Sequence, residues 1–128
     1  MKILESAENY LETILMLSKT RDVVRSIDIA NELDFSKPSV SVAMKNLRTN
    51  GYIEMDHSGH ITLLPAGRAI AEKIYERHTI ITHWLMDLGV SPETAAHDAC
   101  RMEHILSEES FEAMKKHFLE YHMKNHKQ

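Results

Sequence analysis

Apolar residues recur at helical spacing through the first fifty positions of the chain. The segment Glu5–Lys19 carries an apolar stripe with a period near 3.6 residues, which predicts an amphipathic helix. A short helix is predicted next, with Ser26 as its N-cap. Ser36 is the predicted N-cap of a third helix, with Pro38 in its first turn, where a missing amide donor costs little. The residues expected on the buried faces are Tyr10, Leu11, Ile14, Leu15, Leu17, Ile27, Ala30, Leu33, Val40, Met44 and Leu47.

The period of the pattern changes after Gly51, which is expected to end the third helix. Tyr52–Met55 and His60–Leu63 are predicted as two short strands, and Asp56–Gly59 between them as a tight hairpin turn. A short helix, a turn, a second helix and a two-stranded ribbon follow one another in a winged helix-turn-helix. The order of elements therefore predicts this fold for residues 1–64.

Three further helices are predicted after the hairpin. The middle one begins with Ser91 as N-cap and Pro92 at the first helical position. The last one has acidic residues in its first turn, where they favour the helix dipole, and its polar tail from Tyr121 is expected to fray. The three helices are expected over about 65–88, 91–106 and 107–120.

Composition fits an ordinary globular protein. The chain has 128 residues, of which 43% are hydrophobic and 27% charged. A chain of this length buries roughly two thirds of its unfolded surface without needing disulfides. It has no run of about 18 apolar residues and no apolar stretch typical of a signal peptide, so we expect a cytoplasmic protein that does not cross a membrane. The expected fold is mainly α, with the winged helix-turn-helix over 1–64 and a helical domain over 65–128.

The net charge of −4 argues weakly against a nucleic-acid partner, so the local distribution of charge matters more. The segment Ser36–Asn50 contains three basic residues and no acidic one. Its polar face would bring small hydroxyls close to base edges, and Val42 would contact a thymine methyl, while the cations would contact phosphates. The alternative is an all-helical domain that binds no DNA. The predicted DNA-contacting residues are Ser36, Lys37, Pro38, Ser39, Ser41, Val42, Lys45 and Arg48.

Cys100, Glu103 and His104 are spaced i, i+3 and i+4, so they would share one face of a helix. A thiolate, a carboxylate and an imidazole in one patch suit a borderline transition metal. His78 in the preceding helix is a further candidate ligand. Taken singly, each residue has an ordinary alternative, since a lone cysteine is more often a small buried hydrophobe. From the first helix, Asn9 and Glu12 are candidate ligands that would share a face.

Six strings of residues carry a family resemblance. They resemble the iron- and manganese-dependent repressors of the diphtheria-toxin-repressor family, whose manganese branch contains the manganese transport regulators. The match covers nearly the whole chain, and its most specific part is the Cys-Arg-x-Glu-His string after a winged helix. The strings are Glu8–Ile14, Ser36–Ser41, Gly51–Ile53, Leu63–Gly67, Arg77–His78 and His97–His104.

The resemblance implies a homodimer that binds a divalent metal as co-repressor and then binds palindromic operators of metal-uptake genes. Cys100 resembles the iron branch and Glu12 the manganese branch, whereas Asn9 matches neither. Thr82 stands where family members tend to have a carboxylate, and His97 is the candidate substitute. It also implies a short two-domain form without an SH3-like domain, with 65–128 as metal-binding and dimerisation domain. The implied metal ligands are Asn9, Glu12, His78, Cys100, Glu103 and His104.

The thiolate bears on the choice of metal, because sulfur is a softer ligand than a carboxylate. We expect Fe²⁺ first and Mn²⁺ second, with Co²⁺, Ni²⁺ or Zn²⁺ binding in vitro. In the metal-loaded dimer the two DNA-reading helices would sit about one DNA turn, roughly 34 Å, apart.

Two other functions stay open from the sequence alone. One is a metal-independent winged-helix regulator that senses a small organic ligand. The other is a hydrolase in which Cys100 and His104 act as nucleophile and base, or a metal activates water. The absence of a Gly-rich phosphate loop argues against an enzyme, so no organic substrate is expected.

Overall fold

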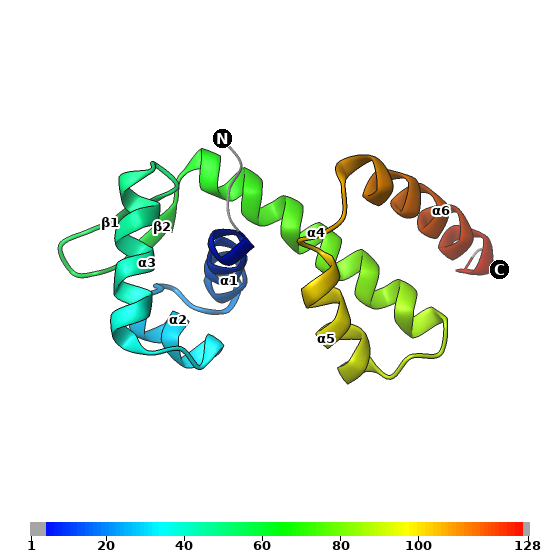
Figure 1. Cartoon of the computed structure of the whole chain (residues 1–128), viewed down its shortest axis with the longest axis horizontal. Helices are drawn as coiled ribbons and strands as arrows, with labels where there is room; N and C mark the ends of the chain where they lie inside the picture. The colour runs from blue at the N-terminus through cyan, green and yellow to red at the C-terminus, as the bar shows by residue number, and fades with distance from the viewer. Residues whose placement is uncertain (1–4, 127–128) are drawn as a thin grey trace. The chain divides into compact units, whose positions relative to one another are not determined.

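The computed structural model describes residues 5–126, with side chains described as far as residue 122, and confirms a mainly α protein with one β-hairpin (Figure 1). The chain forms two compact units, which divide between Ile74 and Tyr75 inside helix α4. The predicted domain boundary after residue 64 stays a prediction. No helix among residues 5–126 combines the length and the apolarity that crossing a bilayer requires. The elements are α1 (Glu5–Thr20), α2 (Ser26–Leu33), α3 (Lys37–Thr49), β1 (Ile53–Met55), β2 (Ile61–Leu63), α4 (Pro65–Asp87), α5 (Pro92–Met102) and α6 (Glu108–His126).

The N-terminal unit is a winged helix-turn-helix, in which α1 packs against α2, α3 and β2, and α3 packs against β1 (Figure 1). The apolar stripes predicted for α1 and α3 are confirmed, since every one of their residues is buried. In α2 the prediction was partly wrong: Ile29 fills the core and Ile27 is exposed. A helix of eight residues is too short for its apolar pattern to define one face.

The starts of α2 and α3 are set by local hydrogen bonds. The prediction for α3 is confirmed, because the Ser36 side chain accepts a hydrogen bond from the Ser39 amide at 3.3 Å. For α2 the predicted cap was wrong. Its N-cap is Arg25 rather than Ser26, because the Arg25 backbone is extended and its amide donates to the Asp28 carboxylate at 2.9 Å. Helix α2 therefore begins with a carboxylate that reaches back, as in a capping box.

The hairpin forms as predicted, with antiparallel pairing of Ile53 with Leu63 across two short strands. In the turn, Asp56 Oδ1 accepts hydrogen bonds from the backbone amides of Ser58 and His60, both at 2.9 Å. The amide of His60 is the main cause that holds the pKa of Asp56 below its usual value. These hydrogen bonds form with the ionised carboxylate. They therefore stabilise the turn fully at a pH above the ordinary Asp pKa, and this stabilisation is lost as the pH falls through the lowered pKa of Asp56.

A methyl group on Gly67 is expected to destabilise the N-terminal unit. A Cβ at this position would overlap the carbonyl oxygen of Tyr52, which also accepts the Leu64 amide at 3.0 Å and so has little room to move. Overpacking of this kind costs about 1–3 kcal/mol. Thermal unfolding of Gly67→Ala should show a lower midpoint than the wild type, whereas the exposed control Ala66→Ser should not. An unchanged midpoint in Gly67→Ala would contradict this close approach.

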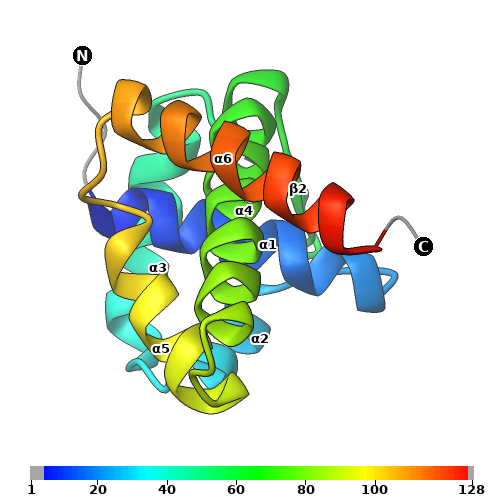
Figure 2. The same ribbon diagram turned by 90° about the vertical axis from the view of Figure 1, so that its right-hand side faces the viewer.

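The C-terminal unit consists of the second half of α4 with α5 and α6. The chain turns after α4 at Gly89, whose φ is 102°. The Ser91 side chain caps α5 as predicted. Helix α6 crosses α4 (Figure 2), and two ion pairs join them: Lys115 lies 3.0 Å from Glu76, and His122 lies 3.4 Å from Asp87. The helix continues past Tyr121 to His126, and residues 127–128 lie outside the described part, so the fraying expected from Tyr121 stays a prediction.

Candidate metal centre and DNA-binding helix

Helix α3 presents the predicted DNA-contacting residues on its outer side. Val40, Met44 and Leu47 are buried and hold the helix to the unit, whereas all eight predicted residues are exposed. Val42 is the most open of the apolar residues here, with 61% of its surface exposed. An exposed apolar side chain among hydroxyls and cations is a suitable contact for a thymine methyl group. The geometry therefore permits α3 to lie against DNA, while the contacts themselves stay a prediction.

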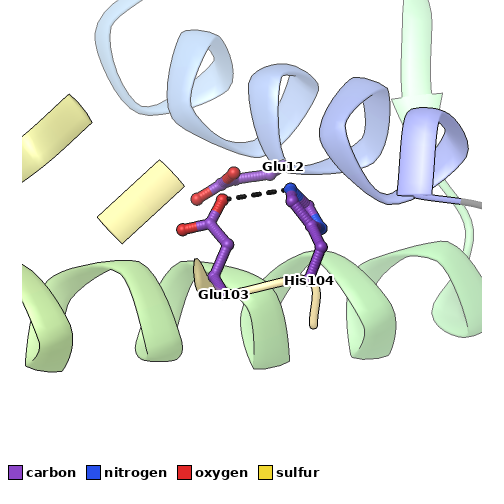
Figure 3. Close-up of side chains that lie close together, drawn as sticks. All are labelled: Glu12, Glu103 and His104. Atoms are coloured by element: carbon purple, nitrogen blue, oxygen red, sulfur yellow. Dashed lines mark ion pairs between the residues drawn. The ribbon is translucent and has the colours of Figure 1, made fainter. Parts of the chain in front are cut away.

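One carboxylate and two imidazoles meet at the turn after α5, with the Glu103 and His104 side chains buried and the His78 side chain 24% exposed. The Glu103 side chain is fully buried, at 0% exposed. Its Oε2 lies 2.9 Å from Nδ1 of His78 in α4. Its Oε1 lies 3.3 Å from Nε2 of His104 (Figure 3). The His104 side chain is only 2% exposed. We call Glu103, His78 and His104 the carboxylate–imidazole cluster.

Burial of this kind is costly unless the charge is compensated. A carboxylate removed from water loses several kcal/mol of solvation, by order of magnitude, and must be paired. The cluster pairs it with the imidazoles of His78 and His104. Carboxylate oxygen and imidazole nitrogen are donors that divalent transition metals accept. The donor set of the cluster therefore fits a divalent metal.

Helix α5 is shorter than predicted. It was expected to reach Leu106 but ends at Met102, so Glu103 and His104 lie in the following turn rather than on the helix. Directly after this end, Arg77 of α4 donates to the carbonyl oxygens of Glu103 and Leu106. Glu103 keeps helical dihedral angles as the C-cap, so it retains its spacing from α5.

The remaining predicted ligands of the C-terminal unit differ in their surroundings. Cys100, the single cysteine of the chain, is exposed in α5, unlike the buried Glu103, and stays a predicted ligand. His97, the candidate for a second site, is also exposed and pairs with Asp98 at 3.6 Å. Thr82 donates its hydroxyl to the carbonyl of His78 at 2.7 Å, which supports α4 locally.

The two predicted ligands in α1 belong to the N-terminal unit. Glu12 is buried, at 4% exposed, which is unusual for a carboxylate. Asn9 is half-buried, and its backbone carbonyl accepts the hydroxyl of Thr13 at 2.8 Å. Both stay predicted ligands.

Arg77 is a residue whose role sequence reasoning missed. A signal was present, because Ile74, Arg77 and Ile81 have the spacing of a buried helical face. An arginine on that face is ordinarily placed at the surface, and only the packing shows that this one is buried.

Comparisons with known proteins agree along the chain. A family model described as "Iron dependent repressor, N-terminal DNA binding domain" matches residues 2–61, and one described as "Iron dependent repressor, metal binding and dimerisation domain" matches residues 64–128. Transcriptional regulator MntR of Escherichia coli O157:H7 is 39% identical over 87% of this chain and 72% of that protein. An HTH-type transcriptional regulator of Methanocaldococcus jannaschii is 33% identical over 87% of this chain and 90% of that protein.

Solved structures agree with the family models. The manganese regulator SloR is similar with a TM-score of 0.78 and 28% identity, covering 90% of this chain and 54% of that one. ScaR with bound Zn²⁺ is similar with a TM-score of 0.72 and 25% identity, covering 90% and 54%. The chain thus spans about half the length of these solved proteins. It belongs to the iron-dependent repressor family of metal-dependent transcriptional regulators.

Proposed function

We propose that this chain is a metal-dependent repressor that binds palindromic operator DNA as a homodimer in the cytoplasm and controls metal-uptake genes. The observation that carries the proposal is the carboxylate–imidazole cluster, in which the buried Glu103 carboxylate lies within 2.9 Å of His78 and 3.3 Å of His104. Membership of a family of metal-dependent regulators supports it. The exposed basic face of α3 supplies the surface for DNA.

Glu103 and His104 are the proposed core ligands, with His78 from α4 beside them. We add Glu12 and Asn9 of α1 and Cys100 of α5 from the family resemblance, since the buried Glu12 carboxylate has the chemistry of a ligand. When bound, a divalent cation would supply positive charge for the buried carboxylates and a fixed coordination geometry.

The chain's own packing suggests how such a site would affect DNA binding. Helix α1, which carries Glu12, packs against both α2 and α3. Glu12 as a ligand would therefore restrain the helix that supports the DNA-reading helix. In a dimer, this restraint would keep the two copies of α3 at a spacing that suits successive major grooves. A coupling of about 1–3 kcal/mol between the sites would change operator affinity by roughly 5- to 150-fold.

The metal proposed is Fe²⁺ ahead of Mn²⁺, because a Cys100 thiolate would favour the softer ion. SloR is named a manganese regulator and ScaR has been solved with Zn²⁺ and with Cd²⁺, so ligand sets of this general kind accept several divalent ions. Cys100 is exposed, which makes it the ligand most open to oxidation.

Removal of metal is expected to weaken operator binding by roughly 5- to 150-fold. The measurement is fluorescence anisotropy of a labelled operator, titrated with the protein in chelator, in Mn²⁺ and, without oxygen, in Fe²⁺. A matched operator of scrambled sequence measures the non-specific part. Equal affinity with and without metal would reject metal control and favour a regulator that senses another ligand. Half-saturation at a lower concentration of Fe²⁺ than of Mn²⁺ is expected, and the reverse order would reject the preference for iron.

A further inference from the structure

Arg77 joins three parts of the C-terminal unit. Its guanidinium is buried, with the residue only 5% exposed. One nitrogen, Nη1, donates to the carbonyl oxygen of Leu106 at 2.7 Å and to that of Glu103 at 3.2 Å. The guanidinium carbon also lies 5.0 Å from the centre of the Phe111 ring in α6. Arg77 therefore connects α4, the turn after α5, and α6.

One of the two carbonyl groups that Arg77 binds belongs to Glu103, the C-cap of α5, and the other belongs to Leu106 at the far side of the following turn. The last carbonyls of a helix have no partner within it and must find other donors. Here the donor is a permanently charged side chain, and charged hydrogen bonds are the stronger kind. The two bonds therefore hold the turn that follows Met102, in which Glu103 and His104 lie.

Glu103 is held at both of its ends by consecutive residues of α4. Arg77 binds its backbone carbonyl, and His78 lies 2.9 Å from its carboxylate. A ligand fixed at two points keeps its position within narrow limits, which a metal site requires of the groups that support its ligands. Its neighbour His104 lies in the same turn and shares this support.

We propose that Arg77 is a positioning residue for the metal centre, and this rests on the proposed function. It touches no metal itself. It holds the turn at residues 103–106 so that the Glu103 and His104 side chains present their donor atoms together. The Phe111 ring holds the guanidinium in place, so α6 takes part in the same support.

The test compares Co²⁺ and Mn²⁺ binding by wild type, Arg77→Met and Arg77→Lys. Arg77→Met is expected to weaken binding roughly 10- to 100-fold, as loss of an outer partner of a metal ligand does. It should also change the visible d–d absorption of bound Co²⁺, which reports coordination geometry. Arg77→Lys keeps one charged donor and should recover part of the affinity and of the spectrum.

Two controls separate positioning from general stability. Arg68→Met removes an exposed arginine from the same helix and should bind Co²⁺ like wild type. Ile81→Val removes one methyl group from the buried face of α4, lowers stability, and should leave the Co²⁺ spectrum unchanged. If Arg77→Met does not fold, Arg77→Lys is compared with the same two controls.

The outcomes are distinct. Weaker binding with an altered Co²⁺ spectrum in the Arg77 variants, and in neither control, would support the proposal. Wild-type binding in Arg77→Met, or in Arg77→Lys where Arg77→Met does not fold, would overturn it and leave the proposed function intact. If Ile81→Val loses metal affinity in proportion to its loss of stability, then lower stability alone explains weaker binding. Arg77 would in that case have only a structural role. A wild-type protein that binds neither ion would overturn both this inference and the proposed function.

Discussion

Glu103→Gln is expected to weaken metal binding by roughly 100-fold or more. Removing a residue that only supports a metal ligand already weakens binding by up to about 100-fold. The change keeps the shape of the side chain and removes its negative charge. Because the group is fully buried between His78 and His104, an uncharged amide should be tolerated by the fold. A neutral amide also carries a smaller desolvation cost than a buried carboxylate.

The measurement for Glu103→Gln is Mn²⁺ titration calorimetry beside thermal unfolding without metal. The matched control is Glu93→Gln, which makes the same chemical change at an exposed position of α5. Glu103→Gln should unfold near the wild-type midpoint and bind metal poorly, while Glu93→Gln should match wild type in both. Wild-type metal affinity in Glu103→Gln would remove Glu103 from the ligand set.

The double variant Lys45→Ala/Arg48→Ala is expected to bind operator more weakly by at least roughly 100-fold, since each charged hydrogen bond to a phosphate contributes about 1.5–3 kcal/mol. Both side chains are exposed on α3 and no acidic residue lies between Ser36 and Asn50. The loss should be nearly independent of operator sequence, because phosphate contacts position a protein without reading bases.

The salt dependence makes this second prediction specific. Removing two phosphate contacts should lower the slope of log affinity against log salt by about 1.8. The control Lys19→Ala/Lys116→Ala removes two exposed cations from α1 and α6, and so matches the change in net charge. Equal losses of affinity in both double variants would mean that only net charge matters, and α3 would no longer be the DNA-reading helix.

The N-terminal unit could be predicted well because its signals are local. Val40, Met44 and Leu47 repeat at helical spacing, Ser36 caps its own helix, and the turn sequence at Asp56 bonds to its own backbone. Each of these contacts lies within a few residues in the chain. The winged helix could therefore be recognised without knowledge of packing.

The C-terminal unit could be predicted only in outline because its decisive contacts are long-range. The turn after α5 is bonded by Arg77, which lies 26 residues before Glu103. Periodicity continued past Met102 and carried no sign of this interruption. The burial of Glu103 depends in the same way on packing between helices, although its spacing from Cys100 and its adjacency to His104 had identified it as a candidate ligand.

Anomalous diffraction from crystals of the protein grown with Mn²⁺ would locate the ion and identify its ligands. We expect a strong manganese peak at bonding distance from the Glu103 carboxylate and the His104 imidazole, with Glu12 as a ligand from α1. Peaks only at exposed imidazoles such as His97, with none at Glu103 and His104, would contradict it.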